Sequence, residues 1–134
     1  MLGLALALDN WHKKGQASTP SNSAPTNTVA PNVTGTAVVG SVLTTDNGTW
    51  TGSPTSYAYQ WNNSATGDIV GANTNSYTLV SGDTGDNILC KVTATNAIGS
   101  NTANSNSIGP IGSGAGTASL DFSQASNSMY APAI

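Results

Sequence analysis

Short runs of residues in which large side chains alternate with small or polar ones constrain the fold of this chain more than any other feature. In the clearest run, the aromatic residues Tyr57, Tyr59 and Trp61 are separated by Ala58 and Gln60. An extended strand places every second side chain on the same face, so the three aromatic rings share one face. Thr, Ser, Asn and Gly together make 65 of the 134 residues, which favours strands and turns over long helices. The pattern predicts an all-β fold.

We expect seven or eight strands, separated by turns at the spacing of a two-layer antiparallel sandwich. An Asp-Asn-Gly sequence at 46–48 is a strong turn signal. The last two expected strands flank Asn96–Asn101 and should form a hairpin. The expected segments are Thr28–Ala30, Ser41–Thr45, Thr49–Thr51, Tyr57–Trp61, Asp68–Val70, Ser76–Val80, Ile88–Thr95 and Thr102–Ile108.

Charge and reactive side chains exclude several functions. The chain carries three Lys, six Asp, no Arg and no Glu, for a net charge of −3. Three cations are too few to bind a run of nucleic-acid phosphates. With one His and one Cys in the whole chain, we expect no enzyme, no cofactor and no metal site, because a nucleophile, base and acid cannot be assembled. Asp83 and Asp86 supply too few oxygens for calcium and are expected in a turn.

Composition divides the chain into four parts. Residues 1–14 are an apolar, then basic arm, and residues 15–25, without large apolar side chains, are typical of a flexible linker. Residues 26–108 carry the strand pattern, and residues 109–134 are expected to be a Gly-rich linker (109–118) followed by a tail. The arm lacks the basic start and the length of a signal peptide, and no apolar run approaches the roughly 18 residues of a membrane span. We therefore expect a protein made in the cytoplasm that is neither exported by a signal peptide nor inserted in a membrane.

Two stretches of the sequence carry motifs that are specific in combination. The first runs from Asn27-Thr28-Val29-Ala30-Pro31 through Asn47-Gly48-Thr49-Trp50-Thr51-Gly52 to Tyr57-Ala58-Tyr59-Gln60-Trp61. The second runs from Ser76-Tyr77-Thr78-Leu79-Val80 to Ile88-Leu89-Cys90-Lys91-Val92-Thr93-Ala94-Thr95-Asn96. Together they resemble the immunoglobulin-like domains of bacteria and bacteriophages, of the kind found in phage capsid decoration and fibre proteins. The resemblance covers 26–108 and implies an immunoglobulin-like antiparallel β-sandwich, although Ile88 stands where antibody domains have a tyrosine.

The resemblance also implies a core. Trp61 takes the position of the central tryptophan, Cys90 that of the cysteine facing it, and Leu43 the opposing position. A lone cysteine forms no internal disulfide, so Cys90 is expected as a buried structural thiol. Stability should then rest on packing of the predicted core residues Leu43, Trp50, Tyr59, Trp61, Leu79 and Cys90. The alternative for the aromatic side chains is a platform that stacks on sugar rings.

Four leucines alternate with small residues at the start of the chain. Leu2, Leu4, Leu6 and Leu8 share one face if this segment is extended. Burying them contributes roughly 6–12 kcal/mol, and ordering the backbone of this segment costs about 7–14 kcal/mol. Because the two terms nearly cancel, the arm needs hydrogen bonds from a sheet edge or a partner's groove. We expect the arm, including Trp11, to bind another chain; an added edge strand on its own domain and a disordered arm are the alternatives.

Together these features predict a non-enzymatic structural protein of a bacteriophage virion, a capsid decoration or head-fibre protein. The arm would dock on other virion proteins, of the capsid or the tail, and many copies of the domain would face outward. The resemblance implies weak adhesion to host-surface glycans, which many copies would strengthen. The alternatives are a tail-fibre or neck component, and a bacterial surface carbohydrate-binding module that would require export.

Overall fold

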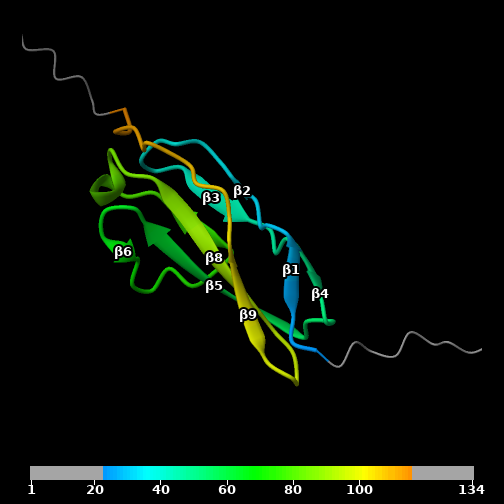
Figure 1. Ribbon diagram of the computed structural model, residues 1–134. Coiled ribbons are helices and arrows are strands. Elements are labelled where there is room, and N and C mark those ends of the chain that lie inside the picture. The colour runs from blue at the N-terminus through cyan, green and yellow to red at the C-terminus, as the bar shows by residue number, and fades with distance from the viewer. Residues whose placement is uncertain (1–22, 116–134) are drawn as a thin grey trace, which may run out of the picture.

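The computed structural model describes residues 23–115, which form nine strands and one 3₁₀ turn (Figure 1). All ladders between these strands are antiparallel. The predicted all-β class is therefore confirmed. The elements are β1 (Thr26–Val29), β2 (Val33–Thr34), β3 (Val42–Thr45), β4 (Thr49–Thr51), β5 (Ser56–Asn63), β6 (Gly67–Asp68), β7 (Ser76–Thr78), η1 (Ser81–Asp83), β8 (Ile88–Thr95) and β9 (Ser100–Asn104).

The strands form two layers. The first is a four-stranded sheet in the order β6-β5-β8-β9, in which β5 and β8 pair over their full eight residues. The second contains the β1-β4 pair and the β2-β3-β7 sheet. Along β8 the buried residues are Ile88, Cys90, Val92 and Ala94, and every residue between them is partly exposed. The alternation read from the sequence thus buries one face of the larger sheet against the second layer.

In the second layer, β1 to β4 form one long ladder that is interrupted in its middle. Val29 pairs with Thr49, and Val33 pairs with Thr45. Each partner of the second pair lies four residues from its counterpart in the first, so the register is kept across the interruption. The Asp-Asn-Gly sequence at 46–48 therefore does not reverse the chain, and the turn predicted there is wrong.

The interruption is filled by the Asp46 carboxylate. Its Oδ1 accepts hydrogen bonds from the backbone N–H groups of Asn32 (2.8 Å) and Gly48 (2.9 Å). Pro31 has no N–H to contribute to the ladder at this point. A proline on one strand and a side-chain acceptor on the other thus replace regular pairing without turning the chain.

Six predicted strands have different bounds. Three of them differ by one or two residues at an end: Ser41–Thr45 is β3 at Val42–Thr45, Tyr57–Trp61 is β5 at Ser56–Asn63, and Ser76–Val80 is β7 at Ser76–Thr78. The segment expected at Asp68–Val70 is β6 at Gly67–Asp68, and the Val70 side chain is 99 % exposed. The segment expected at Thr102–Ile108 is β9 at Ser100–Asn104, which forms the expected hairpin with β8. Thr28–Ala30 is β1 and starts earlier, at Thr26.

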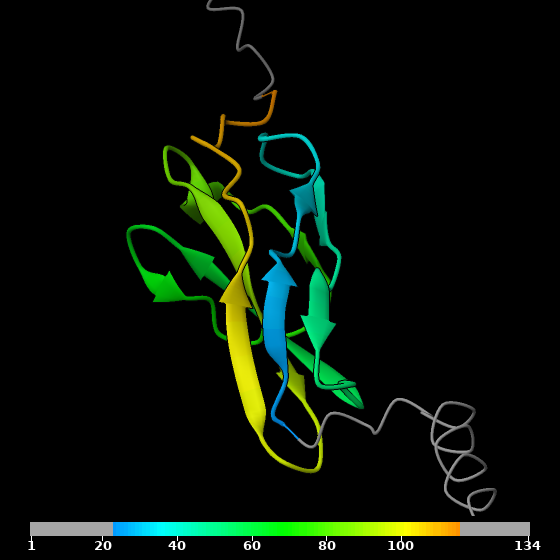
Figure 2. The ribbon, with the colours of Figure 1, turned by 45° about the vertical axis from the view of Figure 1, so that its right-hand side comes forward.

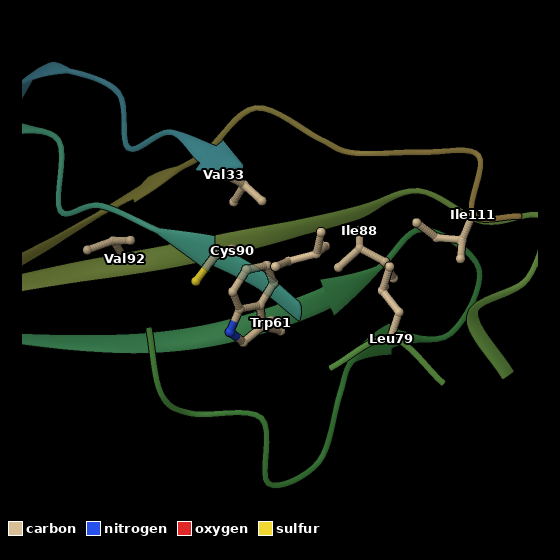
Figure 3. Packing of buried hydrophobic residues seen from close by; sticks show 8 residues of the cluster. Val33, Trp61, Leu79, Ile88, Cys90, Val92 and Ile111 are labelled. Carbon is tan, nitrogen blue, oxygen red and sulfur yellow. The ribbon is translucent and has the colours of Figure 1, made fainter. Parts of the chain in front are cut away.

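The core lies between the layers around Trp61 (Figure 3). The predicted core residues Leu43, Trp61, Leu79 and Cys90 are all fully buried. Several neighbours that were not among the predicted core residues are buried as well: Val33, Ile88, Val92 and Ile111. Trp61 on β5 is paired with Cys90 on β8 in the sheet register. The prediction that Trp50 and Tyr59 belong to the buried core is corrected: both side chains pack on this cluster but remain partly exposed.

The folded part is longer than the predicted domain at both ends. Pro25, assigned to the first linker, is fully buried, and so is Ile111, assigned to the second. Gly112 exchanges backbone hydrogen bonds with Ala37 (2.8 Å) and Val39 (3.0 Å). The prediction of a linker is therefore wrong for residues 23–25 and 109–112, because packing by distant parts of the chain orders these segments.

Residues 105–112 cross from one layer to the other. Ile108 exchanges two backbone hydrogen bonds with Ile88 of the larger sheet, both 2.8 Å long. The Asn106 side chain accepts a hydrogen bond from Val33 N (2.7 Å) and donates one to Val33 O (3.0 Å). A side-chain amide thus pairs with the edge strand β2 as a backbone would, and it closes this flank of the two-layer fold.

The described chain begins and ends at opposite ends of the fold (Figure 2). Asn96, just after the end of β8, donates a hydrogen bond to Ser23 O (2.7 Å). Ile111 bonds to Gly85 and Asp86, just before the start of β8. The eight residues of β8 separate these points, a span of roughly 25 Å for an extended strand.

Candidate functional site

The predicted partner-binding residues, Leu2, Leu4, Leu6, Leu8 and Trp11, lie outside the described residues. The structure describes residues 23–115, and any site that it shows lies among them. Three features there combine polar or aromatic groups: the outer face of the larger sheet, a buried carboxylate beside η1, and one flank between the layers.

The outer face of the larger sheet is polar and nearly neutral. Lys91 Nζ lies 2.6 Å from Asp68 Oδ1, and both side chains are exposed to solvent. The hydrogen bond from Lys91 lowers the pKa of Asp68 below its usual value, and a hydrogen bond from Asn62 adds to this effect. Thr93 and Thr102 share a hydrogen bond between their hydroxyl groups (2.7 Å). Hydroxyl, amide and one paired set of charges give a surface that can exchange hydrogen bonds with a neutral polar ligand.

The buried carboxylate belongs to Asp83. Its Oδ1 accepts from Asn63 Nδ2 (3.0 Å), and its Oδ2 accepts from the Tyr77 hydroxyl (2.9 Å) and from Val80 N (3.0 Å). Burial, followed by the Asp83 hydrogen bond, raises the pKa of Tyr77 to about 12. Both carboxylate oxygens are engaged, so this group fixes η1 between β7 and β8 rather than binding a ligand.

Two observations within residues 23–115 concern groups that could take part in catalysis or metal binding. Burial raises the pKa of the Cys90 thiol to about 11, so little of the nucleophilic thiolate exists near neutral pH. Residues 23–115 hold no group of three or more His, Cys, Asp or Glu side chains arranged to bind a metal ion. Asp83 and Asp86, expected in a turn, lie at the end of η1 and just after it.

One flank between the two layers lacks a covering strand. β7 pairs with β3 but not with β4, and β6 pairs only with Asn62 and Asn63 at the end of β5. Beyond that point, the backbone of Trp61 bonds to Ile69 and Ala72. In the described structure, β4 and the first half of β5 thus have one unpaired edge each. We call this region, with the side chains of Asn47, Trp50, Tyr57 and Tyr59, the open flank.

The backbone of β5 turns hydrogen-bonding groups toward the open flank. Trp61 N–H and C=O point away from β8, toward Ala72 and Ile69. Because these groups alternate sides along a strand, those of Tyr57 and Tyr59 point the same way. No backbone partner from residues 23–115 meets them there.

Asn47 holds the aromatic side chains of the open flank in place. Trp50 Nε1 donates a hydrogen bond to Asn47 O, and the Tyr59 hydroxyl donates one to Asn47 Oδ1; both are 2.6 Å long. Both rings remain partly exposed while they pack on the core. The arrangement offers fixed aromatic surface beside free strand edges, which suits a flat sugar ring or an extended peptide.

The aromatic residues of this flank could be recognised in the sequence, whereas the role of Asn47 could not. The available signal was the Asn47-Gly48 pair shortly before the aromatic residue Trp50, which we assigned to a turn.

The described residues contain no apolar helix of the length that a membrane crossing requires. No family model, curated protein or solved structure matches the chain.

Proposed function

We propose that this chain is a non-enzymatic structural protein of a bacteriophage virion, a capsid decoration or head-fibre protein with an immunoglobulin-like domain. Its arm, residues 1–14, docks on another virion protein, and the domain projects outward from the particle in many copies. The protein is made in the host cytoplasm and resides in the virion. A tail-fibre or neck component differs from this proposal only in where the arm docks.

The observation that carries this proposal is the position of the two ends of the fold. Ser23 is held at the β8–β9 turn, and Ile111 at the far end of β8. A domain joined to its anchor at one end therefore presents the opposite end, and both sheet faces, away from the attachment point. This geometry suits display on a surface better than enclosure within an assembly.

The immunoglobulin-like topology is the finer part of the proposal. Trp61 and Cys90 are neighbours across the central strand pair, and Leu43 of the other layer is fully buried in the same cluster. The segments 33–39 and 106–112 run parallel where Val38 bridges Gly112. These relationships support a sandwich of the immunoglobulin kind that replaces its disulfide by apolar packing.

The arm is tested by two matched variants of the full chain. Replacing Leu2, Leu4, Leu6 and Leu8 by Ser removes the apolar face, whereas replacing Gly3, Ala5 and Ala7 by Ser changes the other face of the same extended segment. Particles grown with each variant are purified, and the protein in them is quantified by mass spectrometry. We expect the leucine variant to be lost from particles and the control to be retained. Equal retention of both would refute anchoring by the arm.

A density map of the same particles distinguishes the alternatives. Density for the domain on the head shell supports decoration, and density at the neck or fibres supports the tail component. Absence of the protein from purified particles would overturn the virion assignment altogether.

A second candidate function, weak glycan adhesion, is favoured by the open flank. Trp50 and Tyr59 are fixed by Asn47 and partly exposed, beside a surface with little net charge. A single shallow site of this kind binds weakly, and many copies on one particle strengthen the contact through avidity. We would probe a glycan array with the full chain presented multivalently on beads, and with its Tyr57→Ala variant. A flat response of the unaltered chain would remove the adhesive function and leave the structural one intact.

A further inference from the structure

Asn47-Gly48 is the one Asn-Gly pair in the chain, and this pair can undergo a chemical change without an enzyme. The backbone nitrogen of Gly48 can attack Cγ of the Asn47 side chain and form a five-membered succinimide ring. The Cγ–Nδ2 bond breaks, and the amide proton of Gly48 leaves with the side-chain nitrogen as ammonia. Water then opens the ring at either carbonyl and produces aspartate or isoaspartate.

In the folded protein, each group needed for this reaction is held by another residue. The electrophilic side chain is fixed because its Oδ1 accepts the Tyr59 hydroxyl hydrogen bond (2.6 Å). The nucleophilic N–H of Gly48 is donated to Asp46 Oδ1 (2.9 Å). The intervening carbonyl of Asn47 accepts from Trp50 Nε1 (2.6 Å). The first two bonds restrain the movements of the Asn47 side chain and the Gly48 nitrogen that would bring Cγ and N together.

The backbone around Gly48 leaves no room for a side chain. Gly48 has φ of +67°, and a Cβ placed there would lie 2.8 Å from Pro31 N and closer still to Val29 O. A side chain is therefore excluded, and the glycine that the strand interruption needs also makes the preceding asparagine most reactive.

We propose that Asn47-Gly48 is a latent modification site that the native fold keeps closed, with the Tyr59 hydroxyl as the main restraint. Opening of this site converts Asn47 to aspartate or isoaspartate. The product places a second carboxylate beside Asp46, and isoaspartate also lengthens the backbone within the interrupted ladder. Deamidation at Asn47 is thus the chemical route by which the open flank loses its shape in a protein stored for long periods.

The test compares Tyr59→Phe with Tyr57→Phe. Each substitution removes one hydroxyl from an inward-facing tyrosine of β5, and Tyr57 makes no hydrogen bond to Asn47. Full-length proteins are incubated at mildly alkaline pH, and conversion of each asparagine is followed by peptide mapping with mass spectrometry. A hydrogen bond of ordinary strength implies that Tyr59→Phe deamidates at Asn47 about fivefold faster, with Tyr57→Phe unchanged.

Two further measurements separate local release from general loosening. The unaltered chain unfolded in urea supplies the rate without the fold, and we expect it to exceed the native rate at Asn47 by at least about tenfold. The other asparagines in the same digest serve as internal references that general loosening would accelerate together. The proposal is overturned if native and unfolded chains react equally fast at Asn47, or if Tyr59→Phe leaves that rate unchanged or raises all sites alike.

Discussion

Trp61 and Trp50 both point between the two layers, and each donates its indole N–H to a backbone carbonyl oxygen, of Thr74 (2.8 Å) and Asn47 (2.6 Å) respectively. Trp61 is fully buried, whereas Trp50 is partly exposed. The difference does not come from the strands themselves, because each ring projects from a strand that has a partner on one side. It comes from the flank: the segment that includes Ile69 and Ala72 covers the strand edge at Trp61, and no described strand covers β4.

This contrast shows that inward orientation and burial are separate properties in a small sandwich. Alternation along a strand decides which side chains face the second layer. Lateral covering by loops and edge strands decides how much water they lose. The half around Trp61, with Tyr77, Cys90 and Ile111, has both, and we call it the closed half. We expect the closed half to supply most of the stability, whereas the open flank has exposed surface available for contacts outside the domain.

Shortening the chain should weaken the closed half most. A chain that ends at residue 108 loses the buried Ile111 side chain and the backbone hydrogen bonds of Ile111 and Gly112. We expect a loss of about 5 kcal/mol in the free energy of unfolding, which approaches the whole stability of a domain this size. Urea unfolding of chains ending at 108 and at 115 tests this. If the shorter chain does not fold, Ile111→Ala should cost about 3 kcal/mol; equal stability of both chains would show that residues 109–112 are a linker after all.

Replacing each tryptophan by alanine compares the two halves directly. Trp61→Ala should lower the free energy of unfolding by about 4 kcal/mol, since it empties a fully buried site. Trp50→Ala should cost about half as much, because part of its ring is already in water. Urea denaturation followed by circular dichroism measures both, with Trp61→Phe as the milder variant. Losses of equal size would contradict the distinction between the closed half and the open flank.

Alkaline pH should destabilise the closed half through Cys90 and Tyr77. Their folded pKa values are raised, from 9.0 to about 11 and from 10.0 to about 12. Raised values stabilise the fold fully below the unfolded pKa, and this stability is lost as pH rises from about 9 to about 12. For the buried thiol the full loss is roughly 2–3 kcal/mol, and for the less buried phenol it is smaller.

Urea unfolding at pH 8, 10 and 11.5 measures this dependence. Cys90→Ala should flatten the lower part of the decline and Tyr77→Phe the upper part. A profile that is flat for the unaltered chain would show that neither group is shielded from water.

The smallest effect concerns the opposite flank, which Asn106 closes. Asn106→Ala leaves Val33 N and O without their side-chain partners and should cost about 1 kcal/mol. The control is Asn104→Ala, an exposed residue of β9 whose loss should change stability by less than about 0.5 kcal/mol. Thermal unfolding of the two variants side by side resolves this difference, and indistinguishable midpoints would mean that the amide bridge adds nothing.

Much of the fold could be predicted because it depends on local alternation. Tyr57 to Trp61 and Ile88 to Thr95 have a period of two and became the central strand pair. Trp61 and Cys90 could be placed in the core because the resemblance and the alternation agree there. In each case the information lies within a few residues of sequence.

The errors occurred where distant contacts override local preference. Asp46-Asn47-Gly48 favours a turn, but pairing on both sides with the strand around Pro31 keeps the chain extended. Ile111, among Gly and Pro, has no periodic neighbours. It is buried because distant parts of the chain pair with its segment: Thr84 bridges Ile111, and Val38 bridges Gly112. The open flank is equally hidden from the sequence, since it results from the absence of pairing rather than from a motif.

Cys90 gives the domain an independence from its redox surroundings. Its sulfur is fully enclosed, and the chain holds no second cysteine to which it could be oxidised. A sandwich stapled by a disulfide gains that part of its stability only after leaving a reducing cell interior. This fold therefore has the same covalent structure under reducing and oxidising conditions, and its stability does not depend on which of the two surrounds it.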